Sequence, residues 1–121
     1  MAEIALTALV GMHNRGQAEN SRELLGLRGY DVTVVRTAED MCRFASENKY
    51  AFYLMDINLG SAGSNDITPA AQVYAIVKER VESGQARFLG ISGANDIVNS
   101  ALKKGIPAKS KLEFAVMTEN L

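Results

Sequence analysis

Short apolar runs alternate along this chain with longer segments in which apolar residues recur at helical spacing. Short apolar runs bounded by turn residues predict β-strands. We predict strands at residues 4–10, 31–35, 51–56, 87–91 and 106–110. The third and fourth runs are apolar at consecutive rather than alternate positions, which is typical of strands covered on both faces. The fifth segment contains Pro107 and few β-branched residues, so it predicts a brief edge strand.

The segments between these strands predict helices. Thr37 is placed to cap a helix N-terminus, Pro69 suits the first turn of another helix, and Gly29 suits a helix C-terminus. Each segment repeats apolar residues at helical spacing: Leu24, Leu25 and Leu27; Met41, Phe44 and Ala45; Val73, Ile76, Val77 and Val81; Ile97, Val98, Ala101 and Leu102; Phe114, Met117 and Leu121. The predicted helices cover residues 17–28, residues 38–47, the segment that Pro69 opens, the segment before Gly105 and a short stretch from Leu112.

Alternation of strand and helix implies right-handed crossovers and a doubly wound α/β fold with a parallel sheet between helical layers. A length of 121 residues fits one domain, which we place at residues 1–121. Composition is that of a globular protein, with 47% apolar and 22% charged residues. The chain therefore has the material for one well-buried core.

Charge and targeting signals narrow the class of protein. A formal net charge of -1 provides no electrostatic basis for binding nucleic acid or an anionic membrane. The apolar runs are far shorter than a membrane helix needs, and the N-terminus lacks a basic region followed by a long apolar core. Cys42 is the single cysteine, so we expect no intramolecular disulfide and no zinc thiolate cluster, and we interpret it as a small apolar filler. These features predict a cytoplasmic protein.

The residues directly after each predicted strand define a candidate site, because open parallel sheets bind ligands beyond the carboxyl ends of their strands. They are Met12, His13 and Asn14 after the first strand, Asp56 and Asn58 after the third, Ser92 and Gly93 after the fourth, and Lys109 or Lys111 after the fifth. A carboxylate, a hydroxyl and an ammonium at one edge suit a phosphoryl group, as nucleophile, hydrogen-bond donor and neutralising charge. Asp56 is the candidate nucleophile.

These residues, in this order, resemble the receiver domain of bacterial-type response regulators. The run 55–59, Met-Asp-Ile-Asn-Leu, is similar to that family's phosphoacceptor motif, the run 91–93 to its hydroxyl position, and the run 105–114 to the segment that carries its lysine. Similarity at residues 22–25 and 28–32 extends the resemblance over essentially the whole chain. It implies a flavodoxin-like sheet of five parallel strands in the order 2-1-3-4-5, in three α/β/α layers.

The resemblance also implies roles for single residues. Asp56 takes the position of the phosphoacceptor, Ser92 that of the switch hydroxyl and Lys111 that of the charge-neutralising lysine. Lys111 is preferred to Lys109 because the run Lys-Leu-Glu-Phe that begins at Lys111 is similar to the family's run of lysine, proline, a variable residue and phenylalanine, with leucine in place of proline.

The expected metal-binding positions depart from the family pattern. The family has two adjacent acidic residues that bind magnesium, and the spacing from the Gly-Tyr pair at 29–30 puts these positions at Met12 and His13. Magnesium prefers hard oxygen ligands, whereas a thioether and an imidazole are softer. Asp56 and Asn58 are the oxygen donors that stay at the site, so we predict that Mg²⁺ binds weakly or not at all.

Two features have alternative interpretations. Residues 60–68 have the composition of a flexible loop, which is either a lid over Asp56 with Asp66 lending an oxygen, or a surface insertion with Asp66 near the start of the next helix. We favour the surface insertion. His13, the single histidine, is either a phosphohistidine or metal ligand or, as we favour, a hydrogen-bonded filler at a strand end.

Three functions fit this pattern. The first is an interaction module with the receiver fold, without magnesium-dependent phosphorylation and without enzymatic activity beyond any self-phosphorylation and dephosphorylation at Asp56. The second is an active receiver that takes phosphate from a histidine kinase. The third is a flavodoxin-like binder of a small ligand, which the lack of a phosphate-cradling loop disfavours. We favour the first, with a histidine kinase or a downstream signalling protein as partner, no nucleic acid or membrane partner, and a monomeric or weakly dimeric state.

Overall fold

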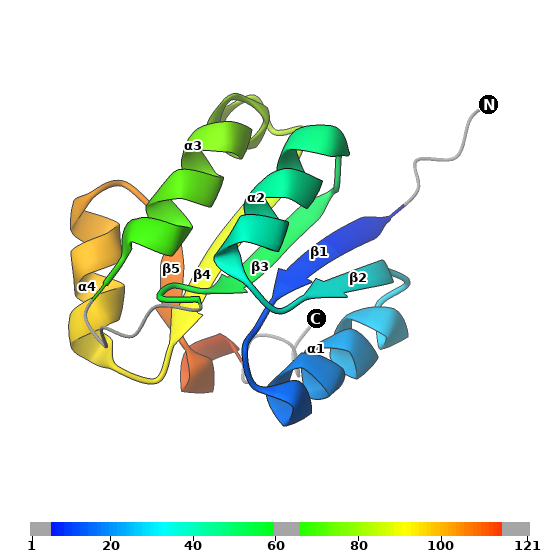
Figure 1. Ribbon diagram of the computed structural model, residues 1–121, viewed down its shortest axis with the longest axis horizontal. Coiled ribbons are helices and arrows are strands. Elements are labelled where there is room, and N and C mark those ends of the chain that lie inside the picture. The colour runs from blue at the N-terminus through cyan, green and yellow to red at the C-terminus, as the bar shows by residue number, and fades with distance from the viewer. Residues whose placement is uncertain (1–5, 60–65, 115–121) are drawn as a thin grey trace.

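The computed structural model describes residues 6–59 and 66–114 of the chain. Its strands are β1 (Thr7–Gly11), β2 (Asp31–Val35), β3 (Phe52–Asp56), β4 (Arg87–Ser92) and β5 (Ala108–Ser110). Its helices are α1 (Arg15–Leu27), α2 (Ala38–Glu47), α3 (Thr68–Glu82) and α4 (Asn95–Lys103), and residues 111–114 form a further helical turn. All strand pairs are parallel and the strand order is β2-β1-β3-β4-β5 (Figure 1). The predicted doubly wound, flavodoxin-like fold is confirmed.

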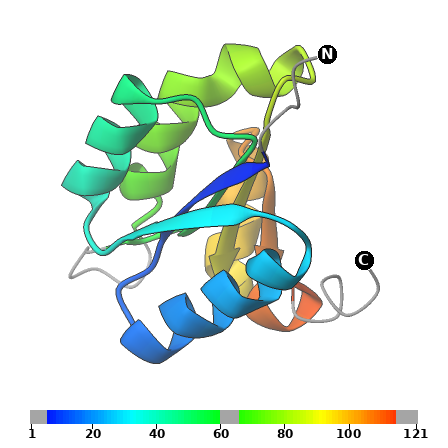
Figure 2. The same ribbon diagram turned by 90° about the vertical axis from the view of Figure 1, so that its right-hand side faces the viewer.

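Helices cover both faces of this sheet. Figure 2 shows α2 and α3 on one side of the sheet and α1 on the other. The first core cluster includes Met41 of α2, Val73 of α3 and Ile97 of α4. The second cluster packs Leu25 of α1 and Phe114 against the opposite face. Every residue of the central strand β3 is buried, which explains why its sequence is apolar without alternation.

The predicted helix signals act as expected at several boundaries. Thr37 Oγ1 accepts a hydrogen bond from the Asp40 N–H at 3.1 Å and caps α2. Pro69 lies in the first turn of α3, where its missing N–H has no intrahelical partner to lose. Gly29 follows α1 with a φ of 89°, in the left-handed region that glycine adopts without steric cost. Sequence signals and tertiary structure therefore agree at these three helix ends.

Other boundaries and contacts differ from the prediction. Helix α1 begins at Arg15 rather than at residue 17, because Asn14 Oδ1 caps it by accepting the Gln17 N–H at 3.0 Å. Leu27 is 76% exposed, so it does not join Leu25 in the core. Strand β5 is limited to three residues. Residues 4–5 of the predicted first strand, and Met117 and Leu121 of the predicted last helix, lie outside the described residues.

Cys42 packs, partly buried, against the cluster that α2 and α3 share. Burial raises the pKa of its thiol, which favours the neutral, unreactive form. This environment agrees with the predicted role of Cys42 as a small apolar filler.

Among the described residues, no helix is long and apolar enough to cross a lipid bilayer.

Gly90 in β4 is a close-approach position, and its replacement by alanine should destabilise the fold. An added Cβ would lie 2.9 Å from Ile57 Cγ1, an atom too near the backbone to move aside freely. We expect the free energy of unfolding to fall by about 1–3 kcal/mol, in line with overpacked cores. Urea unfolding followed by circular dichroism measures it. Gly93→Ala is the matched control, since a Cβ there meets nothing within 4 Å; an equal loss in both variants would contradict the overpacking argument.

Candidate functional site

Asp56 is the last residue of β3 and lies at the C-terminal end of the sheet. Because the residue is only 8% exposed, its carboxylate needs polar partners within the protein. Oδ2 accepts a hydrogen bond from the backbone N–H of His13 at 3.3 Å. Oδ1 is buried and accepts no hydrogen bond from the described residues. The carboxylate is thus held at one oxygen and retains acceptor capacity at the other.

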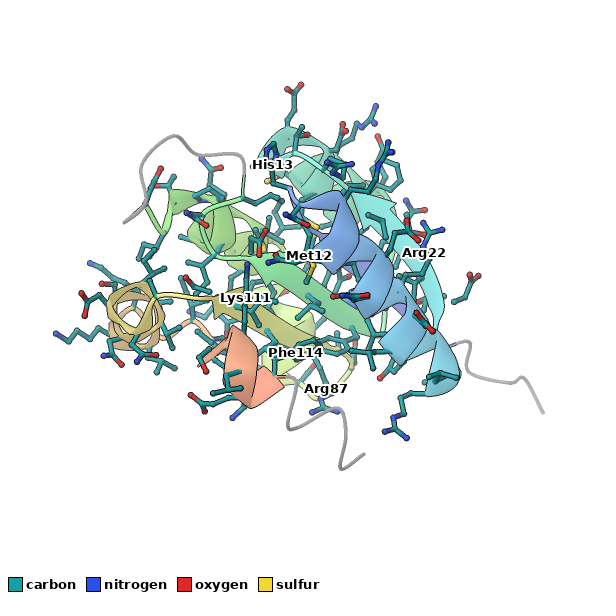
Figure 3. The ribbon with its side chains drawn as sticks, turned by 90° about the horizontal axis from the view of Figure 1, so that it is seen from below. Met12, His13, Arg22, Arg87, Lys111 and Phe114 are labelled. Carbon is teal, nitrogen blue, oxygen red and sulfur yellow. The ribbon has the colours of Figure 1, made fainter. Side chains whose placement is uncertain are left out.

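Lys111 supplies the charge partner of Asp56. Its Nζ lies 3.5 Å from Asp56 Oδ1 and donates a hydrogen bond to Gln17 Oε1 at 2.7 Å. The lysine follows β5 in a helical turn that Ser110 caps, because Ser110 Oγ accepts the Glu113 N–H at 3.0 Å. Figure 3 looks onto this end of the sheet and shows the Lys111 side chain extending from that turn toward the strand ends. The ammonium therefore bridges β3 and α1.

Met12 has a structural contact where the resemblance implies a metal ligand. Its side chain is 1% exposed and belongs to the core cluster between the sheet and α1. Its sulfur accepts a hydrogen bond from Ser21 Oγ at 3.3 Å. Met12 also lines a mainly apolar cavity of about 230 Å³ together with Leu24, Phe114 and Lys111. The thioether is thus engaged with α1.

His13 contributes through its backbone rather than its ring. Its N–H donates to Asp56, and its carbonyl oxygen accepts a hydrogen bond from Arg36 Nε at 3.0 Å. The residue is exposed, so the prediction of a filler that is held by hydrogen bonds of its imidazole does not describe it. Because Arg36 follows β2, its contact ties the loop after β1 to the neighbouring strand. Together these bonds fix the N–H that holds Asp56.

The remaining candidates lie near the same edge with contacts of their own. Ser92 ends β4 and is 7% exposed, and its Oγ accepts the Ala94 N–H at 3.1 Å. Asn58 is half-buried in the turn that follows Asp56. Lys109 pairs with Ile91 inside the sheet, two residues before Lys111, whose ammonium reaches Asp56. Asp66 Oδ1 accepts the Thr68 N–H at 2.9 Å at the start of α3, and residues 60–65 of the predicted loop lie outside the described part of the chain.

The donor set does not fit a magnesium site. Magnesium takes near-octahedral oxygen coordination and is usually held by one or two carboxylates together with phosphate oxygens and water. Asp56 is the carboxylate that ends β3, and an ammonium lies 3.5 Å from its Oδ1. Within residues 6–59 and 66–114, no group of three or more histidine, cysteine, aspartate or glutamate side chains gathers as metal ligands.

Two residues of the site were not predicted from the sequence. Gln17 holds the Lys111 ammonium and Arg36 holds the His13 carbonyl, yet neither belongs to a recognisable motif. The position of Gln17 in the first turn of α1 could have indicated its place in the site. The N-terminal end of a helix that follows a parallel strand lies at the ligand-binding edge of the sheet. Its partner is 94 positions away along the sequence, so the pairing itself required the fold.

Comparison with known proteins identifies the fold as that of receiver domains. A response regulator protein from Burkholderia pseudomallei, solved with a phosphorylated aspartic acid, calcium and citrate, matches 87% of this chain at 24% identity, with a TM-score of 0.67. The chain spans 59% of the length of that protein. A response regulator receiver domain from Methylobacillus flagellatus matches 89% of this chain and 87% of its own at 22% identity, with a TM-score of 0.63.

A third structure extends the match over almost the full length. The receiver domain of a sensor histidine kinase from Pseudomonas aeruginosa, solved with magnesium in its active-site cleft, covers 97% of both chains at 15% identity with a TM-score of 0.67. No protein-family model and no curated protein matches the sequence. The chain therefore has the fold of response regulator receiver domains, at a sequence distance where the match establishes the fold alone.

Proposed function

We propose that this chain is a signal-transduction module with the receiver fold that acts by binding another protein, without magnesium-dependent phosphorylation of Asp56. The proposal rests on the side chains at and around Asp56. Its carboxylate lies beside the Lys111 ammonium at 3.5 Å, while the residue at the first expected acidic position, Met12, packs its side chain into the core. The site retains the receiver's anion and cation and lacks its metal ligands.

The comparison structures support this contrast. The Burkholderia protein carries calcium with a phosphorylated aspartic acid, and the Pseudomonas domain holds magnesium in its cleft. Phosphoryl transfer to a carboxylate brings several negatively charged oxygens together. A metal ion in a receiver site acts as a Lewis acid that stabilises this charge. With softer side chains at positions 12 and 13, the described residues lack the pair of acidic ligands that the resemblance implies for the metal.

Binding to a protein partner accounts for the exposed apolar residues around β5. Leu102 on α4 is 50% exposed, and Leu112 just after β5 is 77% exposed. We take these two leucines as candidate contacts for that partner. We infer a cytoplasmic, non-enzymatic module, monomeric or weakly dimeric, whose partner is a histidine kinase or a downstream signalling protein and neither nucleic acid nor membrane.

One observation favours the second candidate, an active phosphorylatable receiver. Asp56 Oδ1 is a buried acceptor without a hydrogen bond, and it faces Lys111 at 3.5 Å. Nucleophilic attack needs such a free lone pair, and the ammonium neutralises the phosphoryl charge. Ser92 ends the adjacent strand β4 and would be the hydroxyl that binds the phosphoryl group.

Amide NMR spectra separate these two candidates. We expect no saturable shift when magnesium is added at millimolar concentration, and none when the phosphoryl mimic beryllofluoride is added with it. The reason is that the first expected acidic position holds Met12, whose side chain packs into the core. Shifts that saturate and centre on Asp56, Ser92 and Lys111 would establish the active receiver instead.

The double variant Met12→Asp with His13→Asp is the matched control for this experiment. It restores the two expected oxygen ligands beside Asp56, so we expect saturable magnesium-dependent shifts at the loop after β1. An unresponsive double variant that is correctly folded would show that the missing carboxylates are not the cause.

A further inference from the structure

Arg80, in the last turn of α3, lies beside the first residues of β3, whereas Asp56 ends that strand. Its Nη1 donates a hydrogen bond to Tyr53 Oη at 2.6 Å, and its Nη2 donates to the carbonyl oxygen of Tyr50 at 3.1 Å. The guanidinium carbon lies 6.0 Å from the centroid of the Tyr53 ring. These contacts hold the guanidinium in one orientation, half-buried between α3 and the sheet.

The charge of Arg80 is not paired with a carboxylate among the described residues. Ion pairs in that part of the chain include Arg43 with Asp40, Lys78 with Glu82, and Lys111 with Asp56. The oxygens that Arg80 contacts belong to a carbonyl and a hydroxyl, which carry no formal charge. Burial raises the pKa of the Tyr50 phenol, so this neighbour stays neutral too. Each Nη has a second N–H, and the Nε N–H is buried without an acceptor.

A cavity of about 240 Å³ opens beside Arg80, between the end of α2 and α3. Its lining includes Ser46, Asn48, Lys49, Tyr53, Ile76 and Arg80. Lys49 adds a second cation to Arg80, and Glu47 at the same cavity contributes one opposing charge. A second cavity beside Arg80 is lined by Glu79, Ser83 and Gln85. Its lining adds the Glu79 carboxylate to Arg80 and contains no further cation. The positive potential is therefore greater on the Lys49 side.

We propose that this cavity, the Arg80 pocket, binds a small oxyanion: the carboxylate or phosphate group of a free small molecule. A guanidinium fork matches two oxygens of such a group, and an ammonium adds attraction without a fixed direction. The Tyr53 and Tyr50 contacts orient the fork in advance, which reduces the entropy lost on binding. Pockets for drug-sized ligands hold about 300–1,000 Å³, so this smaller cavity suits a small anion. The pocket is separate from Asp56 and independent of the function proposed above.

NMR of the arginine side chains tests the proposal directly on the intact chain. The ¹H–¹⁵N signal of the Arg80 Nε group and the amide signals of residues 48–50 are followed during titrations with sodium phosphate, sodium acetate and sodium chloride at matched ionic strength and neutral pH. We expect saturable shifts with phosphate or acetate and none with chloride. A purely structural Arg80 would give no anion-specific shift, and equal responses to all three salts would overturn the proposal.

Two lysine variants locate the ion without disturbing Arg80. Lys49→Ala should weaken the affinity about two- to five-fold, the range that an exposed charge contributes. Lys103→Ala, at the exposed end of α4, is the control and should leave the affinity unchanged. An unchanged affinity in Lys49→Ala, or an equal loss in both variants, would place the ion elsewhere and reject the Arg80 pocket.

Discussion

Leu54→Ala should lower the free energy of unfolding by about 2–5 kcal/mol, the range for removing a buried leucine side chain from a packed core. Leu54 is fully buried in the middle of β3, where it pairs with Val10 on one side and Leu89 on the other. The substitution leaves a cavity between the sheet and α1, which the parallel backbone pairs restrain from collapsing. A loss of this size is a large fraction of the roughly 5–15 kcal/mol that holds a typical domain folded.

Urea unfolding at equilibrium, followed by circular dichroism, measures this loss. Leu112→Ala is the matched control, because the same side chain is removed from a site that is 77% exposed. We expect the control to stay within about 0.5 kcal/mol of the parent protein. A loss below about 1 kcal/mol for Leu54→Ala would mean that this face of the sheet is less tightly packed than the structure shows.

Arg80→Met should cost about 2–4 kcal/mol of unfolding free energy in chloride buffer without phosphate or carboxylate. Methionine keeps the apolar stem but removes two hydrogen bonds from a charged donor, to Tyr53 Oη and to the Tyr50 carbonyl. Tyr53 is fully buried, so its hydroxyl gains no water in exchange and keeps only the N–H of Tyr50 as donor. The partial exposure of the guanidinium limits the cost to this range.

A double-mutant cycle with Tyr53→Phe isolates the contact between these two side chains. We expect a coupling of about 0.5–3 kcal/mol from the shared hydrogen bond, since phenylalanine removes the hydroxyl and keeps the ring. Arg22→Met on the exposed surface of α1 is the control and should change the stability by less than about 0.5 kcal/mol. Additive losses from the two single variants would show that Arg80 and Tyr53 act independently.

Much of the fold was predictable because local patterns and burial agree. The unalternating apolar run of β3 requires cover on both faces, and the structure buries all its residues. Thr37 and Pro69 mark helix starts through their own backbone chemistry, so α2 and α3 begin at or next to the predicted residues. The prediction was less accurate where a neighbour decided the outcome. Leu27 fits the helical pattern, but none of the described elements covers it, and it is 76% exposed.

The site was predictable to the level of strand ends and no further. The rule that parallel sheets bind ligands beyond their carboxyl ends placed Asp56 and either Lys109 or Lys111 at one edge. The resemblance to receiver domains preferred Lys111, and the structure brings Lys111 within 3.5 Å of Asp56. The direction of a side chain at such an edge depends on what packs beside it. Met12 turned toward Ser21, and Gln17 held Lys111, because α1 lies against that edge. These contacts join residues on different elements and have no periodic signal.

The sequence by itself determined the alternation of strand and helix, the buried central strand and the identity of the charged residues at its end, because these follow from local propensity and from the period of apolar positions. Only the tertiary structure decided which partner each polar group meets: Lys111 for Asp56, α1 for Met12, and two neutral oxygens for the Arg80 guanidinium. The reason is that hydrogen bonds and ion pairs act over a few ångströms, so packing between distant segments decides which groups come within reach.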